Sequence, residues 1–329
     1  MTRPLVIADL TLKNDLILAP MAGYGDPPFR RLCAEWGAGL TVTEMISVKG
    51  LVYKGEKTRR MLAVSEAERP YAAVQLFGRD PAAFARALTE TDALAAFSLI
   101  DINMGCPVPK ITKQGEGSAL LKEPALAAEI VRAVKRHAGG RPVGVKMRLG
   151  YCKDQNIAVD FAKAMEQAGA DLVTVHGRTA HQGYAGLADW DGIAAVKAAV
   201  SVPVAGSGDV SLANYRARRT LVDGLMLGRG ALGRPWLFAV MLGSHTPRRL
   251  PDVLATHIGY MREYAGSAYA AVNFRKHLSH YLHTLPGAKE IKQKAFTIGD
   301  AQALTEYLVG CAPLQNVYTS DKPELLDIR

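Results

Sequence analysis

Cysteine is scarce in this sequence, and its cysteines lie far apart. Among 329 residues they occur only as Cys33, Cys106, Cys152 and Cys311, without a CxxC pair or a histidine-rich neighbourhood. This spacing argues against a disulfide framework and against a zinc site, so we expect no metal ligand set.

Long apolar runs are also missing. No run reaches the about 18 residues that a membrane-spanning helix needs. The charged residues Asp9 and Lys13 come too early for a secretory signal peptide. The sequence therefore predicts a cytoplasmic protein that does not associate with a membrane, and it indicates no obligate protein partner.

Acidic residues are fewer than basic residues. The chain has 40 Lys and Arg against 31 Asp and Glu, a formal net charge of +9. This balance is compatible with a polyanionic partner such as a nucleic acid, although it does not by itself prove one. Hydrophobic residues make up 49% and charged residues 22% of the chain, which predicts a substantial core.

Eight short runs in the first 230 residues resemble strands, and most are continuously apolar, as strands covered on both faces should be. They cover 16–19, 40–43, 72–76, 99–103, 143–147, 172–176, 202–205 and 224–227. Amphipathic stretches typical of helices lie between most of them, at 81–89, 124–137, 157–168 and 190–199. Eight βα units predict an α/β fold, a (β/α)₈ TIM barrel. A doubly wound open sheet is the competitor, but no GxGxxG turn follows the first strand.

Nearly every run ends in a residue with useful chemistry. In a barrel these ends converge on one mouth. The set is Met21, Glu44, Gln75, Asn103 with Cys106, Lys146 with Arg148, His176, Ser207 with Asp209, and Arg229. Lys146 lies inside the apolar run 143–147, and because an unpaired buried ammonium is costly, a purely structural explanation of this residue is harder to sustain.

The segment 101–107, Asp-Ile-Asn-Met-Gly-Cys-Pro, carries the most information. Gly105 permits a sharp turn and Pro107 prevents the strand from continuing, which leaves the Cys106 thiol at the carboxyl end of a strand. A basic loop, 110–118, follows at once. This arrangement indicates proton or nucleophile chemistry on an anionic substrate, and the alternative is a buried structural cysteine.

Two glycine-rich segments follow the last two strands. They read Ala-Gly-Ser-Gly-Asp at 205–209 and Gly-Arg-Gly-Ala at 228–231. Glycines there expose backbone N–H groups, a short helix after Arg229 would direct its positive end at an anion, and barrels often bind phosphate at this position. We therefore expect a phosphate site rather than two ordinary turns.

A bound phosphate at the mouth suggests a phosphorylated cofactor or substrate. Lys146 and His176 could face the ring system of such a ligand, and Gln75 could bond its polar edge. A fixed Lys near N1 of a flavin would stabilise the reduced ring. His176 could instead be a satisfied core histidine, and Met21 could be either core packing or a cofactor contact.

The pattern changes after the barrel. Segment 243–251 is polar and bounded by prolines, which favours a linker. Beyond it Leu254, Ile258 and Met261 recur at helical spacing. The sequence thus predicts a catalytic domain at 1–243 and a small helical domain at 250–329.

Several of these motifs together resemble the bacterial tRNA-dihydrouridine synthases. They are Leu-Ala-Pro-Met-Ala-Gly at 18–23, Asp-Ile-Asn-Met-Gly-Cys-Pro at 101–107, Val-Lys-Met-Arg at 145–148 and Val-His-Gly-Arg-Thr at 175–179. Arg-Lys-His at 275–277 with Leu-Pro-Gly-Ala at 285–288 is similar to the helical domain of that family.

The resemblance implies bound FMN, NADPH as transient reductant, and reduction of a uridine ring in tRNA. Reduced FMN would deliver hydride to carbon 6 of uracil, and Cys106 would donate a proton to carbon 5 as the catalytic acid. By the same resemblance, the implied cofactor contacts are Pro20, Met21, Ala22, Gln75, Lys146, His176, Ser207, Gly208, Asp209, Gly228 and Arg229. The implied substrate contacts are Asn103, Lys110, Arg148, Arg178, Arg275 and Lys276.

One departure from the family is visible, because Ser207 stands where the family usually has Asn. We expect phosphate binding to be retained through the backbone. Two other hypotheses remain open, a flavin barrel that reduces a small molecule of the dihydroorotate or enoate type, and an RNA-binding protein that has lost catalysis. A carboxyl-terminal basic domain argues against the first, and retention of Cys106 argues against the second.

Overall fold

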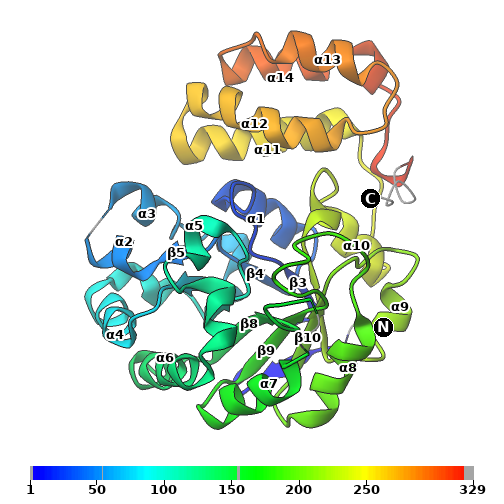
Figure 1. Cartoon of the computed structure of the whole chain (residues 1–329). Helices are drawn as coiled ribbons and strands as arrows, with labels where there is room; N and C mark the ends of the chain where they lie inside the picture. The colour runs from blue at the N-terminus through cyan, green and yellow to red at the C-terminus, as the bar shows by residue number, and fades with distance from the viewer. Residues whose placement is uncertain (1–2, 54, 154–155, 322–329) are drawn as a thin grey trace.

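Eight parallel strands close into a barrel in the computed structural model, which describes residues 3–53, 55–153 and 156–321 (Figure 1). The strands are β3 (Leu16–Leu18), β4 (Leu40–Val42), β6 (Ala72–Phe77), β7 (Leu99–Met104), β8 (Val143–Arg148), β9 (Leu172–His176), β10 (Val204–Ser207) and β11 (Gly224–Leu227). The barrel closes because β3 pairs with both β4 and β11, and β4 pairs with β6. A short extra strand, β5 (Ile46–Ser47), pairs with β6. The predicted (β/α)₈ barrel is confirmed.

The seventh predicted strand is wrong by two residues, since β10 begins at Val204 rather than at 202. The backbone N–H of Val202 is bonded to the Glu166 carboxylate at 3.0 Å, and Pro203 has no N–H to give to a ladder. At its other end β10 continues to Ser207, which pairs with His176 of β9.

Alternation along the strands divides the barrel interior into two layers. An apolar cluster toward the amino-terminal ends includes Ile17, Ala73, Leu99, Leu172 and Ala205. Polar or charged residues follow two or four positions after most of these residues, because alternate side chains of a strand point to the same face. They are Gln75, Asp101, Asn103, Thr174, His176, Ser207 and Asp209. The hairpin β1 (Leu5–Ile7) and β2 (Leu10–Leu12) packs its leucines and isoleucine against the apolar layer.

Helices surround the barrel as predicted. They are α1 (Pro27–Glu35), α2 (Val48–Val52), α3 (Glu56–Arg60), α4 (Pro81–Glu90), α5 (Pro109–Thr112), α6 (Pro124–His137), α7 (Ala158–Gln167), α8 (Trp190–Ala199), α9 (Tyr215–Arg218) and α10 (Leu237–Leu242). Side chains of Asp26, Asp80 and Asp189 accept backbone N–H groups at the starts of α1, α4 and α8. The four predicted helices agree with α4, α6, α7 and α8 to within one residue at each end.

Four further helices lie together on one side of the barrel (Figure 1). They are α11 (Leu250–Ala265), α12 (Ser267–Tyr281), α13 (Ala288–Ala295) and α14 (Ala301–Val309). Their buried faces form a core of their own, and Leu32, Trp36, Trp236 and Ala239 join this core from the barrel side. In the described part of the chain, no helix combines the length and apolar character required to span a bilayer.

The junction between the barrel and these helices combines apolar and charged contacts. Trp36 packs edge-on against Trp236 at a centroid distance of 6.4 Å, and Trp236 stacks on Tyr281 of α12 at 6.2 Å. At the rim, Arg31 of α1 and Glu263 of α11 form an ion pair with an N–O distance of 2.8 Å. The helices are therefore held against α1 and the segment that precedes α10.

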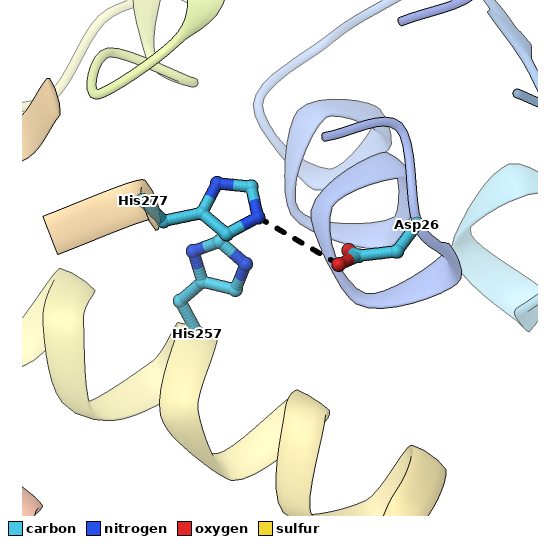
Figure 2. Close-up of side chains that lie close together, drawn as sticks. All are labelled: Asp26, His257 and His277. Carbon is cyan, nitrogen blue, oxygen red and sulfur yellow. Dashed lines mark ion pairs between the residues drawn. The ribbon is translucent and has the colours of Figure 1, made fainter. Parts of the chain in front are cut away.

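A buried polar cluster lies at the same junction (Figure 2). Asp26, before α1, faces His257 of α11 and His277 of α12, and one ligand-type atom of each lies within 4.8 Å of the others. Both oxygens of Asp26 are already used, because Oδ1 accepts the Phe29 N–H at 3.1 Å and Oδ2 lies 3.3 Å from Lys276 Nζ. Although burial acts to raise the pKa of Asp26, His277 and Lys276 hold it well below its usual range. We interpret this cluster as structural, because the ion pair between Asp26 and Lys276 anchors α12 to the start of α1.

Candidate active site

A cavity of about 810 Å³ opens at the carboxyl-terminal ends of the barrel strands. Most of the predicted cofactor residues line it, namely Pro20, Met21, Lys146, His176, Ser207, Gly208, Asp209, Gly228 and Arg229. Two predicted cofactor residues do not, since Ala22 is exposed and Gln75 is fully buried inside the barrel. Residues from five strands that are distant in sequence thus share one concave surface, which is the usual form of a ligand site.

Lys146 projects from the middle of β8 into this cavity. Its neighbours in the strand ladder are Asn103 on β7 and Thr174 on β9. Burial lowers the pKa of Lys146 to about 8, and the positive charge of Arg148 adds to this effect while Asp101 opposes it. No described residue lies within hydrogen-bond or ion-pair distance of the Lys146 ammonium, so the cavity holds a cation that an anionic ligand can neutralise.

His176, at the end of β9, is neutral. Burial lowers its pKa far below the usual value, and the neighbouring cations Lys146, Arg148, Arg178 and Arg229 lower it further. The guanidinium of Arg178 lies 3.3 Å from Nε2 of His176. A guanidinium can only donate, so Nε2 accepts and the ring proton is on Nδ1. The imidazole therefore offers a ligand an N–H donor without a full charge.

The loops after β10 and β11 form the far wall. Gly208 has a φ of +117°, and a Cβ there would lie 2.7 Å from the Cβ of Ala188. Asp209 has a φ of +50°, in the left-handed region, and its carboxylate accepts two bonds from Arg178 Nη2 at 2.7 and 2.9 Å. Arg229 lies 3.5 Å from the same carboxylate. Although burial acts to raise it, the Ala188 N–H and Arg178 hold the pKa of Asp209 low. The expected helix after Arg229 is only the three-residue 3₁₀ turn Arg229–Ala231.

Sequence reasoning missed part of the lining. The loop between β9 and α8 contributes Tyr184 and Leu187, which are 62% and 86% exposed, and Arg229 lies 4.5 Å from the Tyr184 ring centroid. Asn214 and Arg218 brace the β10 loop by donating to the carbonyl of Asp209. The length of the β9–α8 loop, at the functional end of a barrel, was the available signal.

Cys106 lies just beyond β7, and the Asn103 side chain holds the turn on which it sits. Asn103 Oδ1 accepts the backbone N–H of Gly105 at 3.2 Å and of Cys106 at 2.9 Å. The Cys106 carbonyl accepts the N–H of Ser118, which ties the basic loop 110–118 back to the backbone of Cys106. Burial raises the pKa of Cys106, and the Val108 N–H, Arg148 and Lys146 only partly offset this. The thiol therefore stays protonated at neutral pH.

A hydrogen-bonded line of side chains runs below this turn. Asn103 Nδ2 donates to Gln75 Oε1 at 2.7 Å, and Gln75 Nε2 donates to Asp101 Oδ2 at 2.6 Å. All three residues are at most 7% exposed. Burial raises the pKa of Asp101 to about 6, with Gln75 and Lys146 acting in the opposite direction, so it is ionised at neutral pH.

The predicted substrate residues fall in different surroundings. Lys110, in α5, is exposed beside the thiol loop. Arg148 is only 3% exposed and donates to the carbonyls of Gly105, Thr179 and Gly183, so it ties loops together.

Three other predicted substrate residues also differ in what they touch. Arg178 lines the cavity rather than the outer surface. Lys276 faces Asp26 in the junction, whereas Arg275 is partly exposed and lies 5.8 Å from the Phe296 ring centroid. Of the two basic residues of α12, Arg275 is thus the one whose charge is not paired in the junction.

Comparison with solved structures shows a shared fold. A histamine dehydrogenase from Rhizobium sp. 4-9 matches with a TM-score of 0.58 and 14% identity, covering 93% of this chain and 63% of that one. A 2-naphthoyl-CoA reductase matches with the same TM-score and identity, covering 74% of this chain and 52% of that one. This chain therefore spans about half to two thirds of the length of these structures.

Comparison of sequences is more specific. The profile of the family described as Dihydrouridine synthase (Dus) matches residues 17–316. The tRNA-dihydrouridine synthase B of Pseudomonas aeruginosa is 41% identical over 310 residues, covering 90% of this chain and 92% of that protein. The tRNA-dihydrouridine synthase B of Pasteurella multocida is 36% identical over 328 residues, covering 96% and 97%. The resemblance seen in the motifs is confirmed, and the chain belongs to the dihydrouridine synthase family.

Proposed function

We propose that this protein is an FMN-dependent oxidoreductase that reduces the carbon 5–carbon 6 double bond of uridine in tRNA, with NADPH as reductant. One observation carries the proposal. The protonated Cys106 thiol follows β7, and the neighbouring strand β8 brings the Lys146 ammonium into a cavity large enough for a flavin. An acid and a cofactor cavity on adjacent strands are what reduction of a ring double bond requires.

The residues present fit FMN. The Lys146 ammonium, without a partner among the described residues, suits the negative charge that a reduced flavin ring develops near N1, and His176 Nδ1–H suits a second acceptor. Arg229 and the backbone around Gly208 suit the phosphate. A side chain at Gly208 would meet Ala188 and His176, so the packing of this wall requires a glycine next to the proposed phosphate position. Ser207 keeps a hydroxyl at the position where the family usually has Asn, so phosphate binding depends mainly on its neighbours.

Bound and reduced, FMN would supply the hydride for carbon 6 of the uracil ring. The protein itself would supply the proton. Carbon 5 becomes enolate-like as hydride arrives, and the Cys106 thiol would give its proton there. The thiolate left behind is stabilised by the Val108 N–H and by the positive charges of Arg148 and Lys146, which are the interactions that lower its pKa.

We propose tRNA as the substrate, with the barrel at 1–243 binding FMN and the helices from 250 onward binding RNA. The target base must leave its stack to reach the half-buried thiol, so the backbone of the RNA has to be held outside the mouth. Exposed Lys110 beside the thiol loop and Arg275 on α12 are suited to this, and the net charge of +9 favours association. A small substrate would need none of these contacts.

The decisive experiment is a spectrum of the purified protein followed by anaerobic reduction with NADPH. Adding tRNA that lacks dihydrouridine should reoxidise the flavin and leave dihydrouridine in the RNA, detected by mass spectrometry of nucleosides. Reoxidation by dihydroorotate-type or enoate compounds, with no response to tRNA, would move the assignment to a small-molecule reductase. A colourless protein that binds tRNA and takes up no FMN would indicate loss of catalysis.

Arg275→Gln is expected to weaken tRNA binding about tenfold at low salt. The slope of log Kd against log salt should fall by the amount that about one phosphate contact contributes. Lys276→Gln should have less effect on that slope, since its ammonium already faces Asp26 in the junction. Filter binding at several salt concentrations measures both.

The matched control for these variants is Arg132→Gln, on the exposed face of α6 and away from α11–α14 in Figure 1. Flavin content should be unchanged in all three variants. If the slope of log Kd against log salt is the same for wild type and Arg275→Gln, then Arg275 does not contact the RNA.

A further inference from the structure

The line Asp101–Gln75–Asn103 connects the barrel interior to the turn that carries Cys106. It starts at a carboxylate, passes through two side-chain amides, and ends at the backbone N–H groups of Gly105 and Cys106, with successive distances of 2.6, 2.7 and 2.9 Å for the main path. Gln75 is fully buried and Asp101 is 2% exposed, so solvent cannot readily substitute for either partner.

The direction of this line is fixed by its two ends. An amide can in principle be turned so that oxygen and nitrogen exchange places. The carboxylate of Asp101 can only accept, so Gln75 must present its NH₂ to it and its oxygen to Asn103. The N–H groups of Gly105 and Cys106 can only donate, so Asn103 must present its oxygen to them. Both requirements agree, and each amide has one satisfied orientation.

We propose that Asp101 is a positioning residue for the reaction, acting through Gln75 and Asn103 to hold the turn on which the Cys106 thiol sits. This inference rests on the proposed function, in which Cys106 donates the proton. Asp101 itself need not touch substrate or cofactor. Its acceptor-only carboxylate selects the amide orientation that leaves Asn103 Oδ1 facing the Cys106 backbone.

The geometry indicates how the reaction would slow if residue 101 no longer fixed the amide orientation of Gln75. With Asn at position 101, either amide orientation of Gln75 is satisfied at that end, so only the N–H groups of Gly105 and Cys106 still oppose the reversed line. In the reversed line Asn103 turns its NH₂ toward these N–H groups. Those donors then lose their acceptor, and the turn relaxes. Displacing a reacting group by about 1 Å can cost about 10²-fold in rate.

The test compares Asp101→Asn and Asp101→Leu with wild type in the two half-reactions separately. We expect reoxidation of the flavin by tRNA to slow roughly 10-fold to 100-fold, as a small displacement of a reacting group would cause. Reduction by NADPH, which does not use the thiol, should change only a few-fold. Thr174→Val is the matched control, because Thr174 Oγ1 is buried in the same barrel without a described hydrogen-bond partner and lies outside the line.

A double-mutant cycle separates positioning from general damage to the fold. If Asp101 acts through Cys106, then Asp101→Asn should add no further slowing in a Cys106→Ala background. Equal slowing in both backgrounds, or equal slowing of both half-reactions, would overturn the proposal in favour of an effect on the flavin environment through Lys146.

A second readout does not depend on the proposed function. The rate of alkylation of Cys106 by iodoacetamide, followed by peptide mass spectrometry, should change in Asp101→Asn, whereas alkylation of Cys311 in the same sample should not. An unchanged Cys106 rate overturns the positioning role. If wild-type protein shows no tRNA-dependent reoxidation, the proposed function fails, and this readout still decides whether Asp101 positions the thiol.

Discussion

Replacing Cys106 with alanine is expected to lower the rate of tRNA reduction by about 10²-fold to 10⁴-fold, the usual contribution of a positioned general acid. The thiol is kept protonated by burial and sits on a turn held by Asn103. Without it, the enolate-like carbon 5 must take its proton from water. FMN content and tRNA affinity should stay near wild type, because the thiol is not part of the cavity lining.

Single-turnover reoxidation of the reduced flavin by tRNA, with nucleoside analysis of the product, measures this effect. Cys152→Ala is the matched control, since Cys152 is another partly exposed cysteine at the barrel mouth, in the loop after β8, and its loss should leave the rate unchanged. If the Cys106 variant turns over within a few-fold of wild type, another group donates the proton.

Lys146→Met should weaken the binding of FMN and slow its reduction by about 10²-fold to 10³-fold, as loss of one preorganised charge does in other active sites. Methionine keeps most of the length of the side chain and removes the ammonium that faces the cavity. Its neighbours Asn103 and Thr174 remain, so the barrel should fold as before.

The same substitution should change the pH dependence of FMN binding. Burial lowers the pKa of Lys146 to about 8 in the protein without ligand, so the ammonium is present below pH 8 and is lost as pH rises through this value. An anionic ligand favours the charged form, and binding above pH 8 therefore requires uptake of a proton. Wild-type affinity should fall as pH rises from 8 to 9.5, and that of Lys146→Met should vary less.

Fluorescence titration of the apoprotein with FMN gives both results. Lys163→Met, on the exposed face of α7, serves as the control for removal of one lysine charge. Parallel pH profiles for wild type and Lys146→Met would show that another group sets the dependence.

Much of the fold could be predicted from the sequence, because a parallel barrel repeats one local pattern. Apolar runs of four or five residues and the amphipathic stretches between them are local signals, and they marked strands and helices to within about two residues. The family was also recognisable, since its motifs are short and continuous. The boundary of β10 was misjudged because the Glu166 side chain, 36 residues away, takes the N–H of Val202.

The site was predictable only in part. Residues at strand ends could be named because the barrel mouth gathers them, and nine of the predicted cofactor residues line the cavity. What each charge touches could not be known from sequence. Arg148 bonds three backbone carbonyls and Lys276 faces Asp26, and both partnerships depend on chain segments that are remote in sequence. The Tyr184 loop has no motif, so only its position at the mouth indicated it.

The apolar layer and the β1–β2 hairpin at the amino-terminal end of the barrel have a kinetic consequence. They leave the opposite end as the approach to the cavity, so the nicotinamide donor and the flipped nucleotide of the proposed reaction would use the same opening. Under the proposed function the two cannot occupy the flavin face together. The bound flavin would hold two electrons after the nicotinamide has reduced it. The oxidised nicotinamide would have to dissociate before the RNA binds.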